Sequence, residues 1–193
     1  MRQITIIQGH PDPACNRLLH AMADAYAEGA AAGGHEVRRV EVAKLDFPIL
    51  RTKEDFEKGT TPEALKDAQD AIRWADHLVF LYPLWLGDMP ALFKAFLEQT
   101  LRPGFAFDYL AGGKIEMHLT GKSARIILTM GMPALAYRLW FGAHSLKSFE
   151  RNILKFAGIR PVRRNLFGMV EGVSDTKRKK WLDELRRLGR DGS

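Results

Sequence analysis

Residues 77–101 read HLVFLYPLWLGDMPALFKAFLEQTL, and this stretch decides the fold. It opens with a continuous apolar run, Leu78 to Tyr82, which is typical of a strand buried on both faces. Helical periodicity begins at Pro90, which suits the first turn of a helix because its missing N–H needs no partner there. The intervening loop therefore lies at the carboxyl end of a central strand, where open α/β sheets bind ligands.

Three large apolar residues occupy this loop: Leu84, Trp85 and Leu86. They can line a ligand site, or they can pack against the end of the sheet. Packing is the simpler interpretation when the loop is considered alone.

The composition is that of an ordinary globular protein, because 46% of the 193 residues are hydrophobic and 27% are charged. We expect one domain over residues 1–193 with a full core. No apolar run approaches the ~18 residues of a membrane span, and the amino terminus lacks the layout of a signal peptide. A single cysteine, Cys15, excludes an internal disulfide framework. We interpret it as a small packed thiol in a cytoplasmic protein.

The formal net charge is +6, and much of the excess lies in residues 177–190. Apolar residues recur at helical spacing in this segment, so we interpret its cations as the solvated face of a terminal helix. We therefore expect no nucleic-acid partner. A milder functional interpretation is that the charge attracts an anionic cofactor.

The whole chain alternates strand and helix patterns. Further strands are predicted at residues 3–8, 35–42, 123–129 and 162–169. Helices are predicted at residues 16–32 and 61–74, after Pro133 through Phe156, and at the carboxyl end, with irregular segments at 47–61 and 102–122. This alternation predicts a parallel sheet covered by helices on both faces, a three-layer α/β sandwich, with the common strand order 2-1-3-4-5.

That strand order brings three loops to one edge of the sheet, after Gln8, after Tyr82 and after Thr129. The first loop carries His10, and the helix that begins near Asn16 presents free N–H groups that can seat a phosphate. Asn16 can cap the helix or bind the anion, and Arg17 can add a charge-assisted contact. The alternative for His10 is a loop histidine that bonds nearby backbone.

Other catalytic and binding patterns are missing from the sequence. It has no G-x-x-x-x-G-K-[ST] phosphate loop, no G-x-G-x-x-G fingerprint, no G-x-S-x-G elbow, no C-x-x-C pair and no H-E-x-x-H metal motif. We predict no metal site. An anion seat, a flat apolar wall and a glycine-containing third loop fit a planar ring with a phosphate tail, and flavin is the obvious candidate.

Three motifs resemble the flavodoxin-fold NAD(P)H:quinone oxidoreductases, the group of DT-diaphorase and its short bacterial relatives. These are GHPDP at 9–13, YPLWLGDMPALFKAFLEQTLRPGFAF at 82–107 and LTMGMPALAY at 128–137. The resemblance implies a flavodoxin-like fold and tightly bound FMN, with FAD as the alternative. It also implies hydride transfer from NAD(P)H to the flavin and onward reduction of a quinone or similar electrophilic acceptor.

The resemblance also assigns site residues. It places His10 near the flavin phosphates, with Asn16 and Arg17 as further contacts. The segment along the isoalloxazine is Pro83, Leu84, Trp85, Leu86 and Gly87, and the loop at the ring's polar edge is Thr129, Met130, Gly131 and Met132. The sequence departs from the family at Ala14-Cys15-Asn16-Arg17 and at T-M-G-M, where the family often has a serine and T-T-G-G.

Two catalytic residues follow from the same resemblance. Tyr137 matches a tyrosine beside the flavin, and His144, seven residues later, would lie on the same face if one helix carries both. The pair would support charge on the reduced flavin; a plain surface histidine is the alternative for His144. Phe105 and Phe107 match aromatic residues at the mouth of the site and the dimer contact.

These features lead us to expect a homodimer with its sites at the interface. Two other functions stay open. A flavodoxin-like electron carrier usually has an acidic surface, which the charge of +6 opposes. A regulatory subunit of a potassium-efflux system would share the fold, and nothing in the sequence excludes it.

Overall fold

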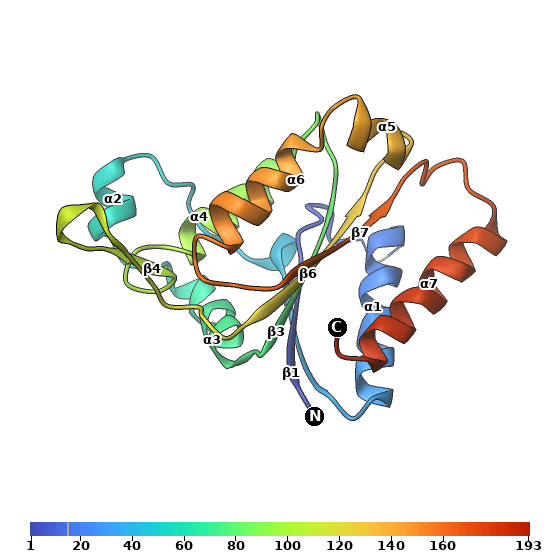
Figure 1. The fold of residues 1–193 in the computed structure, drawn as a ribbon, viewed down its shortest axis with the longest axis horizontal. Helices are drawn as coiled ribbons and strands as arrows, with labels where there is room; N and C mark the ends of the chain where they lie inside the picture. The colour runs from blue at the N-terminus through green and yellow to red at the C-terminus, as the bar shows by residue number, and fades with distance from the viewer. Residues whose placement is uncertain (15) are drawn as a thin grey trace.

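The computed structural model describes residues 1–14 and 16–193, so the interpretation of Cys15 lies outside the described residues. A five-stranded sheet in the order β2-β1-β3-β6-β7 forms the centre of the molecule (Figure 1). Its strands are β1 (Gln3–Gln8), β2 (Glu36–Glu41), β3 (His77–Pro83), β6 (Ser123–Thr129) and β7 (Val162–Phe167). Every pairing is parallel, which confirms the predicted order 2-1-3-4-5.

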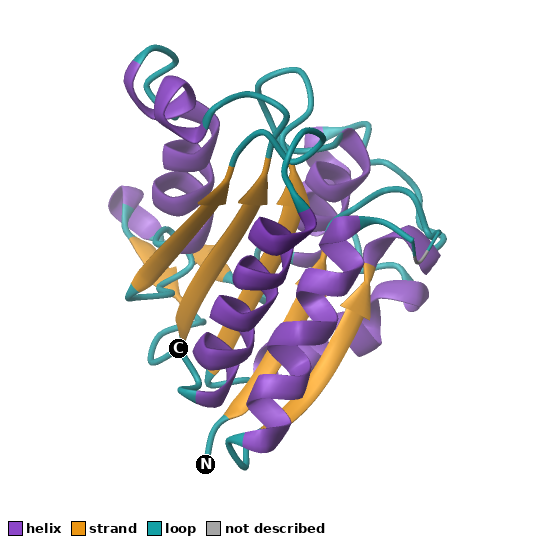
Figure 2. Cartoon of the chain, turned by 90° about the vertical axis from the view of Figure 1, so that its right-hand side faces the viewer, coloured by secondary structure: helices purple, strands orange, loops and turns teal. Residues whose placement is uncertain are grey.

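Helices cover both faces of this sheet and complete the predicted sandwich. They are α1 (Leu18–Ala32), α2 (Lys53–Lys58), α3 (Lys66–Trp74), α4 (Ala91–Thr100), α5 (Ala134–Leu139), α6 (His144–Ser148) and α7 (Asp175–Arg190). α1 and α7 lie side by side across one face, and α3, α4 and α6 lie on the other (Figures 1 and 2). Among the described residues, none of the helices combines the length and the apolar character that a bilayer span requires.

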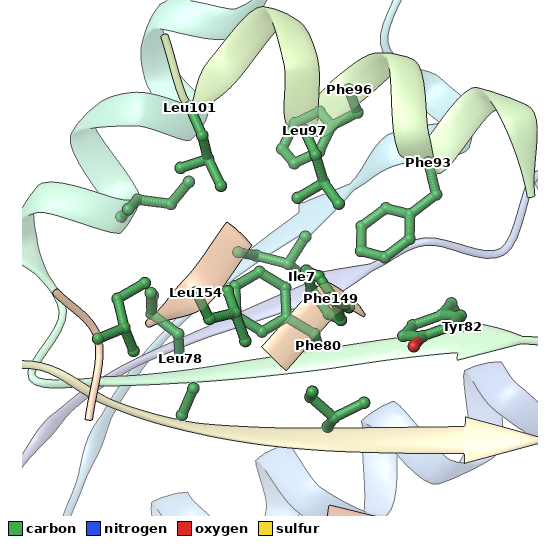
Figure 3. Packing of buried hydrophobic residues seen from close by; sticks show 14 of the residues in the cluster. Ile7, Leu78, Phe80, Tyr82, Phe93, Phe96, Leu97, Leu101, Phe149 and Leu154 are labelled. Atoms are coloured by element: carbon green, nitrogen blue, oxygen red, sulfur yellow. The ribbon is translucent and has the colours of Figure 1, made fainter. Parts of the chain in front are cut away.

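Strand β3 is buried along its whole length, as its apolar run predicts. Phe80 and Tyr82 face the larger apolar core, where Phe93 of α4 lies 5.3 Å from the Tyr82 ring and Phe149 lies 5.2 Å from the Phe80 ring, measured between ring centroids (Figure 3). Val79 and Leu81 face the smaller core beneath α1 and α7. The central strand thus connects the two cores.

α1 and α7 pack backbone against backbone. A Cβ atom on Gly29 would lie 1.9 Å from the carbonyl oxygen of Arg186, and one on Gly189 would lie 2.1 Å from that of Tyr26. This contact turns the lysines and arginines of α7, such as Lys179 and Arg190, toward solvent. The solvated-face interpretation of the basic segment agrees with this arrangement.

Two segments that we predicted to be irregular contain regular structure. α2 forms within residues 47–61, and the Thr52 hydroxyl caps it by accepting from the Asp55 N–H at 3.1 Å. Residues 102–122 contain an antiparallel ribbon, β4 (Phe107–Tyr109) with β5 (Ile115–Met117). Both were missed because six-residue and three-residue elements are too short to show a clear period.

Two helix predictions were wrong in detail. α1 begins at Leu18 rather than near Asn16, because Arg17 has an extended backbone with ψ of 145°. The helix expected after Pro133 is broken: Gly142 and Ala143 adopt left-handed backbone angles, with φ of 62° and 49°, between α5 and α6. A π-helix, Phe149–Leu154, follows α6. Consequently Tyr137 and His144 do not share one helical face.

Candidate functional site

The three predicted loops meet at the carboxyl edge of the sheet (Figure 2). Each is tied to its neighbour by a main-chain hydrogen bond. The Gly9 N–H donates to the Leu81 carbonyl at 2.7 Å, the Leu84 N–H to the Thr129 carbonyl at 2.7 Å, and the Met130 N–H to the Phe167 carbonyl at 2.9 Å. Pairing of the strands therefore holds all three loops next to one another at the carboxyl edge of the sheet.

The first loop is compact and orients the His10 ring. The Asp12 N–H donates to His10 Nδ1 at 3.0 Å, which leaves Nε2 of a neutral ring as an N–H donor. Burial lowers the pKa of His10 below 6.5, and the nearby His20 lowers this pKa further. The local backbone bond proposed as the alternative for His10 exists, and it leaves the second ring nitrogen available to a ligand.

Arg17 lies in the same loop but is not free. Its Nη2 and Nε atoms lie 2.6 Å and 2.8 Å from Asp12 Oδ2. The Ala14 N–H and then the Arg17 guanidinium lower the pKa of the Asp12 carboxyl. Asn16 is exposed just before α1. An anion at this helix start would meet exposed Asn16 and an arginine that already has a carboxylate partner.

The second loop is a tight turn that points an apolar wall outward. Trp85 and Asp88 exchange two main-chain hydrogen bonds of 2.8 and 2.9 Å, and the two residues between them, Leu86 and Gly87, have positive φ. The Trp85 side chain is 51% exposed and its ring stands edge-on to His10 at 6.0 Å. Leu86 is fully exposed. Neither residue plugs the sheet.

The remaining residues of the second loop pack inward. Pro83 is the buried last residue of β3, and Leu84 packs against the larger core. The packing interpretation is therefore correct for Leu84 and wrong for Trp85 and Leu86.

The third loop offers its main chain rather than its side chains. Thr129 and Met130 are buried, whereas Met132 is partly exposed. A Cβ atom on Gly131 would meet nothing within 4 Å, so a flat group can approach the backbone there. The resemblance implied contacts from both backbone and hydroxyl groups to the ring's polar edge; the open main chain at Gly131 is compatible with the backbone contacts, whereas the Thr129 side chain is buried.

Tyr137 and His144 lie in different environments. The Tyr137 hydroxyl is 2.7 Å from Ser145 Oγ and accepts from the Leu146 N–H at 3.2 Å, and the residue is 2% exposed. His144 is exposed at the first residue of α6, with its ring folded toward Gly142. The partner of Tyr137 in this structure is thus Ser145, which the sequence did not suggest.

Phe105 and Phe107 are both buried rather than presented at an open mouth. Phe107 packs on Phe156 with ring centroids 4.8 Å apart. It lines a hollow of about 540 Å³ between α2, α4 and the ribbon, away from the three loops. The loops are the better candidate site, because they gather exposed apolar surface and polar groups at the switch point of the sheet.

Two buried polar groups near the loops were not predicted from the sequence. The only indication for each was a polar residue within an apolar pattern. Tyr82 has a buried hydroxyl without a hydrogen-bond partner among the described residues. Burial, with Tyr137 and Asp88 nearby, raises the pKa of this hydroxyl. His20 is buried on α1 beneath the first loop. No cluster of three or more histidine, cysteine, aspartate or glutamate residues suited to a metal occurs in the described ranges.

The residues present fit a flavin. An exposed tryptophan, an open glycine main chain and an imidazole N–H with a helix start converge on one edge, as a ring with a phosphate tail requires. The profile of the flavodoxin-like fold family matches residues 2–188. The chain belongs to this family. The flavodoxin-like fold expected from the sequence motifs is confirmed.

Individual relatives of this flavodoxin-like chain are oxidoreductases by name. An uncharacterized NAD(P)H oxidoreductase from Haemophilus influenzae is 28% identical over 182 residues, which cover 92% of this chain and 89% of the relative. An FMN-dependent NADH:quinone oxidoreductase from Macrococcus caseolyticus is 27% identical over 150 residues, 68% of this chain and 70% of the relative.

Among solved structures, Smu.1420 from Streptococcus mutans matches with a TM-score of 0.82 at 29% identity, over 97% of this chain and 98% of that one. Relatives and structural neighbours of the flavodoxin-like chain thus include NAD(P)H:quinone oxidoreductases. None of these is named as a transporter subunit, so the potassium-efflux alternative has no support.

Proposed function

We propose that this protein is a flavin-dependent oxidoreductase that transfers two electrons from NAD(P)H to a quinone or similar electrophilic acceptor. One observation carries the proposal: Trp85 and Leu86 stand exposed between His10 and the open backbone at Gly131. A contiguous exposed apolar patch, unlike a single exposed side chain, marks a binding site or an interface. The names of the relatives support the same reaction.

FMN is the cofactor we propose, with FAD as the alternative, and it supplies the two-electron chemistry when bound. The His10 N–H, the amides at the start of α1, Asn16 and Arg17 would hold its phosphate. The ring would lie along Pro83–Gly87, with its polar edge at the main chain of Thr129–Met132. The second substrate would stack on the open face beside Trp85.

Tyr137 and His144 are proposed to act at the ring. A hydroxyl or imidazole placed where charge develops lowers the barrier without an equal gain in ground-state binding. The Tyr137 hydroxyl is held in place by Ser145 and the Leu146 amide. These two hydrogen bonds orient Tyr137, whereas the exposed His144 side chain would have to turn toward the flavin ring.

We also propose a cytoplasmic homodimer. Exposed apolar residues gather at the carboxyl edge of the sheet, in the second loop and in the segment that follows the third loop. They include Trp85, Leu86, Leu135, Leu139, Trp140 and Phe141. A two-fold contact would bury this surface near the sites.

The test of the cofactor is direct. Purified protein titrated with FMN or FAD should perturb the flavin absorption and quench its fluorescence, and the complex should oxidise NADH or NADPH when a quinone is present. Trp85→Ala should weaken flavin retention or quinone turnover. The control Trp181→Ala removes an indole of α7 that packs on Phe167, and it should leave flavin affinity unchanged. Absence of a spectral change with either flavin at high micromolar concentration would overturn the proposal.

A further inference from the structure

A buried polar pair lies directly beneath the first loop. Gln8 is the last residue of β1 and His20 belongs to the first turn of α1, and they are 2% and 7% exposed. The Gln8 side-chain amide bonds His20 Nδ1, and His20 Nε2 lies 3.1 Å from the main-chain carbonyl oxygen of Asp12. His20 therefore bridges the end of a central strand and the loop above it.

The bonding pattern assigns the tautomer of His20. The Gln8 amide N–H donates to Nδ1, so Nε2 carries the ring proton and donates to the Asp12 carbonyl. The other polar side-chain atom of Gln8, Oε1, is buried without a hydrogen-bond partner among the described residues. Two apolar side chains would fill this space with a smaller desolvation cost than a glutamine and a histidine. Packing alone therefore does not account for the histidine.

Asp12 is the residue through which this bridge acts. Its carbonyl accepts from His20, and its N–H donates to His10 Nδ1 at 3.0 Å. Its carboxylate accepts from the Ala14 N–H at 2.9 Å and from Arg17. Fixing the Asp12 main chain thus fixes the His10 ring directly, and the Asp12 carboxylate in turn holds the Arg17 guanidinium.

We infer that His20 is a positioning residue for the phosphate end of the cofactor, which it aligns through Asp12. The inference rests on the proposed function, because His10 and Arg17 are the groups proposed to face the flavin phosphate. His20 itself is covered by the loop and has no role in electron transfer. It makes the phosphate seat rigid before the cofactor arrives, and preorganisation of this kind raises affinity.

The experiment compares FMN with riboflavin, which has the same ring and no phosphate. In wild-type protein FMN should bind more tightly than riboflavin. His20→Asn keeps an amide near Gln8 but lacks the donor to Asp12, and it should weaken FMN binding roughly tenfold, as expected for one lost hydrogen bond, with riboflavin unchanged. His20→Gln can still reach Asp12 and should restore most of the FMN affinity.

His35→Asn is the matched control, because His35 bonds Arg2 and Arg190 instead of this loop. It should leave both affinities unchanged. Equal loss of FMN and riboflavin affinity in His20→Asn would overturn the inference in favour of a general structural role. Unchanged FMN affinity would overturn it as well.

A folding defect is distinguishable from a positioning defect. Circular dichroism and thermal melting of each variant identify any loss of structure, and the ratio of FMN to riboflavin affinity is insensitive to a smaller folded fraction. If His20→Asn does not fold, His20→Gln decides the matter, since the inference requires that its affinity ratio stay close to wild type. Failure of wild-type protein to bind either flavin would overturn the proposed function and this inference together.

Discussion

His77 shows how a single buried residue couples the stability of this fold to pH. It lies at the start of β3, 2% exposed, with Nδ1 2.8 Å from Ser123 Oγ. Its Nε2 atom is buried without a partner among the described residues. Burial, followed by the nearby Arg125 charge, lowers the pKa of His77 from 6.5 to about 3. The folded protein therefore keeps this ring neutral in weak acid.

We expect this shift to reduce stability as the pH falls. Between 6.5 and about 3 the unfolded chain binds one proton more than the folded chain at His77, so the free energy of unfolding decreases through that window. At about pH 5 the loss is about 2 kcal/mol. Urea denaturation at neutral pH and at about pH 5 measures this loss of stability. The loss should be smaller by about that amount in His77→Gln, while exposed His144→Gln should show the same pH dependence as wild type. The same decrease in the free energy of unfolding with pH in wild type and His77→Gln would show that His77 is not the group responsible.

Tyr137 allows a test of the proposed catalytic group. Tyr137→Phe should slow reduction of the bound flavin by NAD(P)H roughly ten- to a hundredfold, the effect of one hydrogen bond to a developing charge, with a smaller change in flavin affinity. Stopped-flow absorbance measures both. Because Ser145 holds the hydroxyl, Ser145→Ala should combine with Tyr137→Phe less than additively, whereas His144→Gln should be additive with it. If Tyr137→Phe reduces its bound flavin at the wild-type rate, the hydroxyl has no catalytic role and Tyr137 only shapes the site.

Among the secondary-structure elements, α1 and α7 depend on glycine for their close approach. Gly29→Ala would place a methyl group 1.9 Å from the Arg186 carbonyl oxygen. We expect overpacking to lower the free energy of unfolding by about 2 kcal/mol or more, despite the better helix propensity of alanine. Gly172→Ala is the control, because a Cβ there meets nothing within 4 Å, and its effect should stay within about 0.5 kcal/mol. Equal stability of the two variants in urea would contradict the backbone contact.

The segment between α5 and α6 shows why the elements of the site were harder to predict than those of the sheet. Leu139, Trp140 and Phe141 continue a helical pattern, yet the chain turns at Gly142 and Ala143. Gly142 is a local signal for a helix end, but the left-handed conformation of Ala143 is uncommon for a residue with a Cβ atom and has no such signal in the sequence. The break moves His144 away from Tyr137 and places Ser145 beside it.

For the whole molecule, the exposed apolar edge predicts the assembly. Light scattering with size-exclusion chromatography should give about twice the chain mass of 21.8 kDa. Trp140→Asp should shift the protein toward the monomer and lower quinone turnover if the sites lie at the interface. Thr176→Asp on α7, an exposed position on the opposite face of the sheet, should leave the mass unchanged. A wild-type monomer at high micromolar concentration would contradict the dimer.

The amino-acid sequence by itself determined the sheet, its strand order and the edge at which the loops gather. The apolar run from Leu78 to Tyr82, the Pro90 helix start and the glycines that end helices are local signals. Right-handed crossovers then leave few topologies for five such strands. The motifs in the three loops were also sufficient to indicate the family, which the match over residues 2–188 confirms.

Only the tertiary structure decided which side chains of those loops face outward and which partners they have. Leu84 and Trp85 are neighbours of similar hydrophobicity, yet one packs and the other is half exposed, because the turn at Leu86 and Gly87 reverses the chain. The bridge from Gln8 through His20 to Asp12 joins β1, α1 and the loop between them. Such contacts depend on backbone angles and on distances between elements, which local periodicity does not encode.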